Sequence, residues 1–122
     1  MKRTECKTEQ EFKMWYIASI LRAQYEEVFC IETEETVRGF PDVMCIKKDG
    51  RVVFFEFKYT DAKKIEFKPS QSAFYKAHPK LNIWVIAYKA KTDEIIEFPV
   101  WDMSTREGDK RYYMDSKNRV AI

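Results

Sequence analysis

The 122-residue sequence has little cysteine, histidine, glycine or proline, and these shortages narrow the possible functions. Its three cysteines, at positions 6, 30 and 45, are odd in number and lack metal-type spacing, which indicates a reduced, intracellular protein. The single histidine, His78, argues against a histidine-based zinc site and against a Ser-His-Asp catalytic site. There is no apolar run as long as a membrane span and no signal-peptide core, so we expect a cytoplasmic protein.

The charges are nearly balanced over the whole chain but unevenly distributed along it. Residues 1–46 carry 6 basic and 9 acidic side chains (net −3), and residues 92–122 carry 5 and 7 (net −2). Residues 47–91 carry 11 basic and 4 acidic side chains (net +7). A basic middle third is typical of a phosphate-binding face, but also of a solvated lysine surface, and charge alone leaves both open.

Repeats, linkers and low-complexity segments are also missing, which predicts a single domain over residues 1–122. Thr8 followed by Glu11 forms a capping box, and the apolar spacing after it predicts a helix that ends near Tyr25. A second helix is expected from Pro69 or Ser70 to about Ala77. The predicted strands are residues 28–34, 42–46, 51–59, 81–88 and 94–103, the last nearer an edge because of Pro99.

The segment between residues 60 and 70 is interpreted as a polar, lysine-rich connection, and the tail from residue 110 is ambiguous. The resulting order, α-β-β-β-α-β-β, predicts an α/β fold in which a sheet packs against helices. An Asp-Gly pair at positions 49 and 50 predicts that strands 42–46 and 51–59 form a hairpin.

Three charged side chains stand in this hairpin where apolar residues are expected. Glu56 and Lys58 share one face of the second strand, about 7 Å apart at roughly 3.3 Å per residue. A turn at the Asp-Gly pair places Asp42 opposite about Phe57, beside Glu56 and Lys58. The three charges are therefore predicted to converge at the open end of the hairpin.

Buried carboxylates need partners, and this group can be satisfied in two ways. In a structural interpretation, Lys58 forms an ion pair with Glu56 or Asp42 at the rim of the sheet. In a catalytic interpretation, the two carboxylates hold Mg²⁺ or Mn²⁺, which lowers the pKa of a bound water, and Lys58 orients or deprotonates that water. The E-x-K pattern by itself leaves both open.

The E-x-K pattern belongs to a longer series of motifs. The series is "TEQEFK" near the start, Gly39-Phe40-Pro41-Asp42, thirteen further residues, Glu56-Phe57-Lys58, and Gln71 in "KPSQSAFY" at a helix start. Together these pieces resemble the PD-(D/E)XK nuclease superfamily, and most closely its VRR-NUC family, over residues 8–90. The resemblance implies a restriction-endonuclease-like core with a mixed central sheet flanked by helices.

The resemblance also implies roles for residues of the hairpin and the second helix. Asp42 and Glu56 would be metal ligands, the main-chain carbonyl of Phe57 a third ligand, and Lys58 the catalytic lysine. Gln71 would align Lys58, the water or the phosphate. The alternative for Gln71 is a surface glutamine that caps the first turn of its helix.

An acid on the first helix completes the implied catalytic and metal-binding set. Glu9 has the family spacing to Phe12, but Glu11 lies on the same turn. Because the capping box gives Glu11 a sufficient structural role, we favour Glu9 as the catalytic and metal-binding acid.

Basic residues flank the expected site and are candidates for binding DNA backbone phosphates. For Arg38 the alternative is a solvated loop arginine. The candidates are Arg38, Lys63, Lys64, Lys68 and Lys76.

The function implied is a Mg²⁺- or Mn²⁺-dependent DNA endonuclease in a bacterial cell or a virus-infected host cell. A chain of this size resembles the stand-alone VRR-NUC proteins of viruses and bacteria that form dimers. A homodimer with two active sites suits a two-fold symmetric substrate, so branched DNA, and a Holliday junction first, is the expected partner. The alternatives are a nicking or restriction-type nuclease acting on duplex DNA, and a DNA-binding module that no longer cuts.

Overall fold

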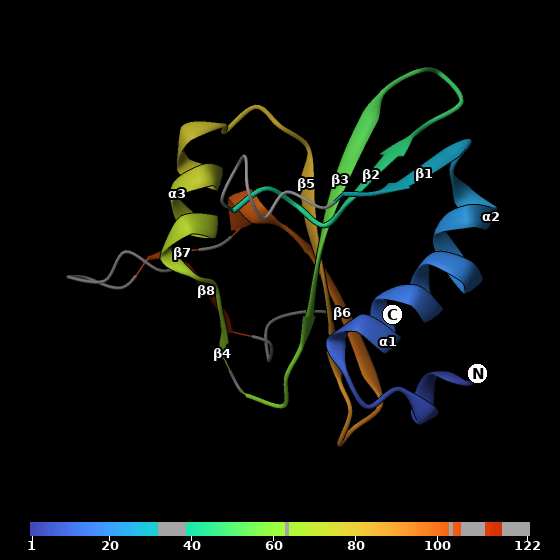
Figure 1. The fold of residues 1–122 in the computed structure, drawn as a ribbon. Helices are drawn as coiled ribbons and strands as arrows, with labels where there is room; N and C mark the ends of the chain where they lie inside the picture. Colours follow the sequence, from blue (N-terminus) through green and yellow to red (C-terminus); the bar gives the residue numbers. More distant parts are fainter. Residues whose placement is uncertain (32–38, 63, 103, 106–111, 116–122) are drawn as a thin grey trace.

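Five strands form the central sheet, in the order β1-β2-β3-β5-β6 (Figure 1). The computed structural model describes residues 1–31, 39–62, 64–102, 104–105 and 112–115. Strands β3 and β5 are parallel, whereas the other three neighbouring pairs are antiparallel, so the sheet is mixed. The strands are Glu27–Cys30 (β1), Val43–Ile46 (β2), Val52–Tyr59 (β3), Ile83–Lys89 (β5) and Glu94–Pro99 (β6).

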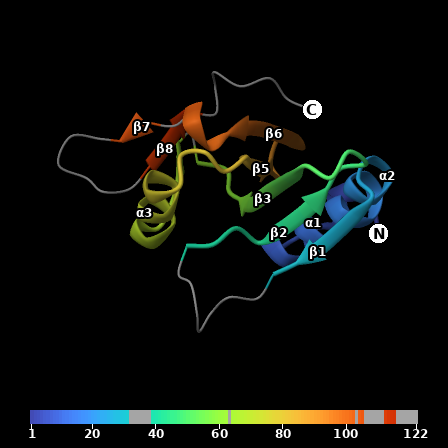
Figure 2. The same cartoon turned by 90° about the horizontal axis from the view of Figure 1, so that it is seen from above.

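A continuous helical segment covers one face of the sheet (Figures 1 and 2). It consists of α1 (Glu9–Tyr16), one π-helical turn (Ile17–Leu21) and α2 (Arg22–Gln24). The side chain of Thr8 accepts a hydrogen bond from the N–H of Glu11, so the segment begins at the predicted N-cap. No helix among the described residues is long and apolar enough to cross a membrane.

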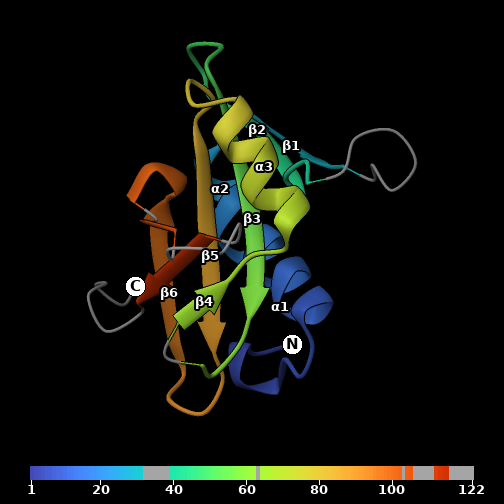
Figure 3. The same cartoon turned by 90° about the vertical axis from the view of Figure 1, so that its left-hand side faces the viewer.

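The opposite face is covered by α3 (Pro69–Ala77) and by a second, three-stranded sheet (Figure 3). This small sheet has the order β4-β8-β7 and is antiparallel. Its strands are Lys64–Glu66 (β4), Ser104–Thr105 (β7) and Tyr112–Asp115 (β8). Two short 3₁₀ turns, Arg3–Glu5 and Val100–Asp102, complete the described elements.

Each face of the central sheet has its own apolar core. On the side of α1, Phe57 packs against Phe12 and Tyr16. On the side of α3, the core contains Phe67 and Tyr75. Because side chains alternate along a strand, Glu56 and Lys58 share one face of β3, as the sequence predicts, and this face points away from the α1 core and toward α3.

The α/β fold class, the first helix, the hairpin and the second helix agree with the sequence-based expectations. The expected connection at residues 60–70 is wrong in part, because it contains strand β4. Ile65 and Phe67 are both buried while Glu66 between them is exposed, an alternation typical of a strand. The described tail adds β8, which pairs with β4 and explains why this polar segment is extended.

The register of the hairpin also differs from the expectation. Val43 pairs with Phe55, which places Asp42 level with Glu56 and not with Phe57. The N–H of Lys47 donates to the carbonyl of Arg51, so three residues form the loop instead of the two-residue Asp-Gly turn. Residues that lie opposite each other share a face, so the observed register turns Asp42 toward the same side as Glu56.

The loop before β2 is fixed against the start of α3 at Gly39. This residue has φ +82, and a Cβ there would overlap the main-chain carbonyl of Ser70. The next residue, Phe40, packs edge-on against Phe54 of β3 and Phe74 of α3. The loop that leads to Asp42 is thus held between the sheet and α3.

We predict that Gly39→Ala destabilises the protein much more than Gly50→Ala. Both glycines have positive φ, +82 and +88, so both variants carry the strain of a left-handed backbone, about 1 kcal/mol. Only at Gly39 would the added Cβ overlap backbone atoms of another segment, and moving that segment away costs roughly 2 kcal/mol more. Thermal unfolding should show losses of about 10 °C and about 4 °C. Equal losses would contradict the docking of this loop on α3.

Candidate active site

Glu56 is the one buried carboxylate among the described residues, with 3% of its surface exposed. Its Oε1 accepts a hydrogen bond of 2.6 Å from Nε2 of Gln71. Its Oε2 is buried and has no hydrogen-bond partner among the described residues. The pKa of Glu56 is raised from 4.5 to about 8. Burial is the largest cause, and the negative charge of Asp42 is the second. A cation bound nearby would therefore stabilise the ionised form of Glu56.

Asp42 follows the Gly39-Phe40-Pro41 loop and stands immediately before β2. Its Oδ2 accepts a hydrogen bond of 3.2 Å from the main-chain N–H of Phe57. The N–H and C=O of one strand residue point to the same side of the strand, so the carbonyl of Phe57 is directed to the side where Asp42 lies. Two side-chain carboxylates and one main-chain carbonyl thus face a common region.

Gln71, in the first turn of α3, connects Glu56 with Lys58. Its Oε1 accepts from Nζ of Lys58 at 3.1 Å and from the main-chain N–H of Lys68 at 3.0 Å. Because both of these groups are donors, the amide nitrogen of Gln71 is left to donate to Glu56. Gln71 therefore caps its helix and orders the site at the same time, which combines the two alternatives that the sequence left open.

The ion pair of the structural interpretation is not formed. The described residues include no ion pair between Lys58 and either Glu56 or Asp42. The ammonium of Lys58 instead lies 4.8 Å from the ring centroid of Phe67, in addition to its hydrogen bond with Gln71. Sequence reasoning missed Phe67, although the Ile-Glu-Phe alternation of residues 65–67 was a signal for a strand that buries it.

The two acids of the first helix have different surroundings. Glu11 accepts a hydrogen bond of 3.1 Å from the main-chain N–H of Lys7, one residue before the N-cap Thr8, so the return bond of the predicted capping box is shifted by one residue. Glu9 reaches solvent, but its pKa is raised, mainly by partial burial. The positive charge of Lys58 acts to lower this pKa, and the negative charge of Asp42 acts to raise it. Glu9 therefore lies within electrostatic reach of the site, whereas Glu11 is occupied at the helix start.

The candidate DNA-binding residues are only partly covered by the structure. Arg38 and Lys63 lie outside the described residues, and only the backbone of Lys64 is described, in β4. Lys68 is exposed at the start of α3, and its charge acts on Glu9. Lys76 is exposed in the last turn of α3. Of the described candidates, Lys68 is the one whose charge acts on an acidic residue of the expected site, Glu9.

The donor set fits a divalent cation, provided that water and main chain contribute. Among the described residues, no three acidic, histidine or cysteine side chains lie close enough to hold a metal ion together. Asp42 and Glu56 offer hard oxygen donors, as Mg²⁺ and Mn²⁺ prefer, and Oε2 of Glu56 makes no hydrogen bond of normal geometry with the described residues. The charges of Asp42 and Lys58 act on Glu9, and its role as a metal-binding acid stays a prediction.

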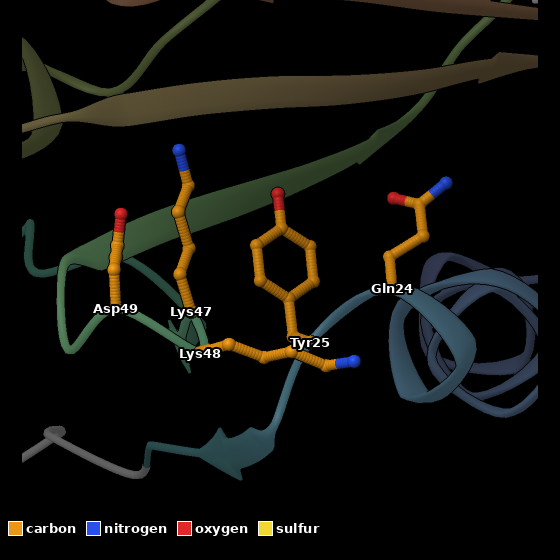
Figure 4. Close-up of a pocket in the computed structure, with 5 residues that line it drawn as sticks. All are labelled: Gln24, Tyr25, Lys47, Lys48 and Asp49. Atoms are coloured by element: carbon orange, nitrogen blue, oxygen red, sulfur yellow. The ribbon is translucent and has the colours of Figure 1, made fainter.

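A depression of about 460 Å³ lies elsewhere, at the turn of the β2–β3 hairpin (Figure 4). It is lined by Gln24, Tyr25, Lys47, Lys48 and Asp49. Asp42 and Glu56 pair at the opposite, open end of this hairpin, so the depression is separate from them.

Comparison with solved structures identifies the architecture. The chain superposes on Hjc, a Holliday junction resolvase from the archaeal hyperthermophile Archaeoglobus fulgidus, with a TM-score of 0.66. The match has 12% sequence identity and covers 95% of this chain and 93% of Hjc. This chain has the fold of Hjc.

D212, a nuclease from a fusselovirus, matches with a TM-score of 0.50 and 13% identity, over 89% of this chain and 77% of D212. No protein-family model and no curated protein matches the sequence. The expected restriction-endonuclease-like core is thus confirmed as a fold, and the assignment to VRR-NUC stays a prediction.

We predict that Glu56→Gln stabilises the metal-free protein at pH 8. The unfolded carboxyl ionises near pH 4.5 and the folded one near pH 8, so the wild type loses stability as the pH rises between these values. The glutamine avoids this loss, and its melting temperature in EDTA should exceed that of the wild type by roughly 3 °C or more at pH 8 and by less at pH 5. Mn²⁺ should raise the melting temperature of the wild type but not of the variant.

Glu27→Gln, an exposed carboxylate on edge strand β1, is the matched control and should show neither effect. The decisive quantity is the melting temperature of the wild type minus that of Glu56→Gln, both in EDTA. A higher value at pH 8 than at pH 5 would contradict the burial of an unsatisfied carboxylate.

We predict opposite effects for the two acids of the first helix. Glu9→Gln should weaken Mn²⁺ binding, measured by calorimetry, and leave the melting temperature nearly unchanged. Glu11→Gln should lower the stability by about 0.5 kcal/mol, because it weakens the cap, and leave Mn²⁺ binding unchanged. A larger loss of Mn²⁺ affinity in Glu11→Gln would reverse the assignment.

Proposed function

We propose that the protein is a metal-dependent endonuclease that hydrolyses phosphodiester bonds in branched DNA, with the Holliday junction as its first substrate. The observation that carries this proposal is the meeting of Asp42, Glu56, Lys58 and Gln71 at one place. The fold, which is that of a Holliday junction resolvase and of a viral nuclease, gives these residues their context. Membership of the VRR-NUC family is part of the same proposal.

The roles follow from the donors that each residue offers. Asp42, Glu56 and the carbonyl of Phe57 would hold Mg²⁺ or Mn²⁺, and the bound ion would supply Lewis-acid chemistry and a more acidic water. Lys58 would orient the attacking water and stabilise negative charge that develops on the phosphate. Gln71 would keep Lys58 in place through its 3.1 Å hydrogen bond.

Binding of DNA would be mainly electrostatic. The net charge of +7 over residues 47–91 supports contacts with backbone phosphates, which give affinity without sequence readout. Lys68 would contact the phosphate nearest the carboxylates, with Arg38, Lys63, Lys64 and Lys76 along the adjacent backbone. A homodimer would present two such sites to the two-fold symmetry of a four-way junction.

A cleavage assay on a four-way junction tests the proposal. The wild type, with Mg²⁺ or Mn²⁺, should cut the junction in preference to flapped and linear DNA and elute as a dimer in size-exclusion chromatography. Lys58→Ala should lower the cleavage rate by about 10² or more, because the lysine acts on the reacting groups. Lys80→Ala removes an exposed lysine as a control and should cut at the wild-type rate.

The other outcomes distinguish the alternatives. Binding of DNA without nicking, with any divalent metal, would favour a DNA-binding module. Sequence-dependent cleavage of linear duplex DNA would favour a restriction-type nuclease over a junction resolvase.

A further inference from the structure

Lys58 is held by an uncharged surface, and this surface is built by Phe67. The ammonium nitrogen lies 4.8 Å from the centre of the Phe67 ring, within the range of a cation–π contact. The ring is 1% exposed, so water does not compete for the face that Lys58 approaches. We propose that Phe67 is a positioning residue for Lys58; this inference rests on the proposed nuclease function.

The position of the Phe67 ring is itself fixed by packing. Tyr75 packs edge-on against Phe67, with ring centroids 5.9 Å apart and planes at 75°. Phe67 directly follows β4, and the pairing of β4 with β8 sets the path of its backbone. The ring therefore has little freedom to move away from the ammonium group.

Phe67 and Gln71 restrain Lys58 in different directions. Gln71 binds the ammonium through one directed hydrogen bond of 3.1 Å, whereas the ring attracts it over a whole face. Both residues belong to the same short segment, which joins β4 to the first turn of α3. A lysine side chain has four rotatable bonds, and two contacts from one rigid segment remove most of this freedom.

An aromatic partner has a chemical advantage over a carboxylate at this position. An ion pair with Glu56 or Asp42 would occupy the oxygens that a divalent ion needs. The face of a phenyl ring attracts a cation but carries no net charge, so it restrains Lys58 and leaves both carboxylates available. This accounts for a lysine that lies beside two acids and pairs with neither among the described residues.

The simpler explanation is that Phe67 only fills the core on the α3 side. Ring fluorination separates the two roles, because it weakens the negative ring face stepwise while the shape changes little. Phenylalanine with one, two or three ring fluorines is introduced at position 67. The single-turnover cleavage rate of a four-way junction should fall progressively, roughly 3- to 30-fold over the series, while the melting temperature stays constant.

The same fluorinated residues at Phe98 provide the matched control. Phe98 is equally buried in the same core, so its series should leave the cleavage rate unchanged. A rate that does not vary with fluorination at position 67, or that varies equally at position 98, would overturn the inference.

A second measurement does not depend on cleavage. In the metal-free protein, the ε-methylene protons of Lys58 should resonate upfield of those of Lys80, because the ε-carbon is bonded to the ammonium nitrogen that lies over the Phe67 ring. The upfield shift should disappear in Phe67→Leu. The signal is assigned to Lys58 by its absence from the spectrum of Lys58→Ala. Unshifted protons in the wild type would overturn the positioning role even if the protein cuts DNA. Shifted protons in a protein that cuts no DNA would uphold the positioning and reject only the proposed function.

Discussion

The burial of Glu56 is the constraint around which the site is arranged. A carboxylate with 3% exposure, one satisfied oxygen and one unsatisfied oxygen is costly in the folded protein. Asp42 adds a second negative charge nearby, and the positive charge of Lys58 is bound by Gln71 and Phe67. Burial therefore keeps Glu56 largely protonated near pH 7 in the metal-free fold, even though the charge of Lys58 acts in the opposite direction. A bound divalent cation would favour the ionised form of Glu56.

Three separate parts of the fold supply this arrangement. The β2–β3 hairpin carries both acids and the lysine, the segment from β4 to α3 supplies Gln71 and Phe67, and the first helix brings Glu9. None of these parts is complete alone, because each buries its apolar face against another. Gly39 connects two of them, since its missing side chain lets the loop before β2 rest directly on α3. The precision of the site thus comes from packing and not from local propensity.

Much of this could be predicted from the sequence, because hairpin, helix and capping signals are local. The grouping of Glu56 and Lys58 on one face followed from strand alternation alone. The register did not, since it depends on whether two or three residues form the loop at Gly50. Strand β4 also escaped prediction, because the alternation of residues 65–67 is a short signal within a lysine-rich segment and its partner β8 is distant in the sequence. The contact of Lys58 with Phe67 depends on that strand and was equally hidden.

The parallel pairing of β3 with β5 has a consequence for how the molecule assembles. Parallel neighbours need a crossover, and here the crossover includes β4 and α3, the segment that carries Gln71 and Phe67. Strand β5 follows this segment in the chain, so β3 gains its parallel neighbour only after Gln71 and Phe67 have been synthesised. A nascent chain that has emerged only as far as the hairpin would hold both acids and the lysine, yet it would lack the elements that order them. Ordering of the active centre would therefore come late in biosynthesis, after strand β5 leaves the ribosome.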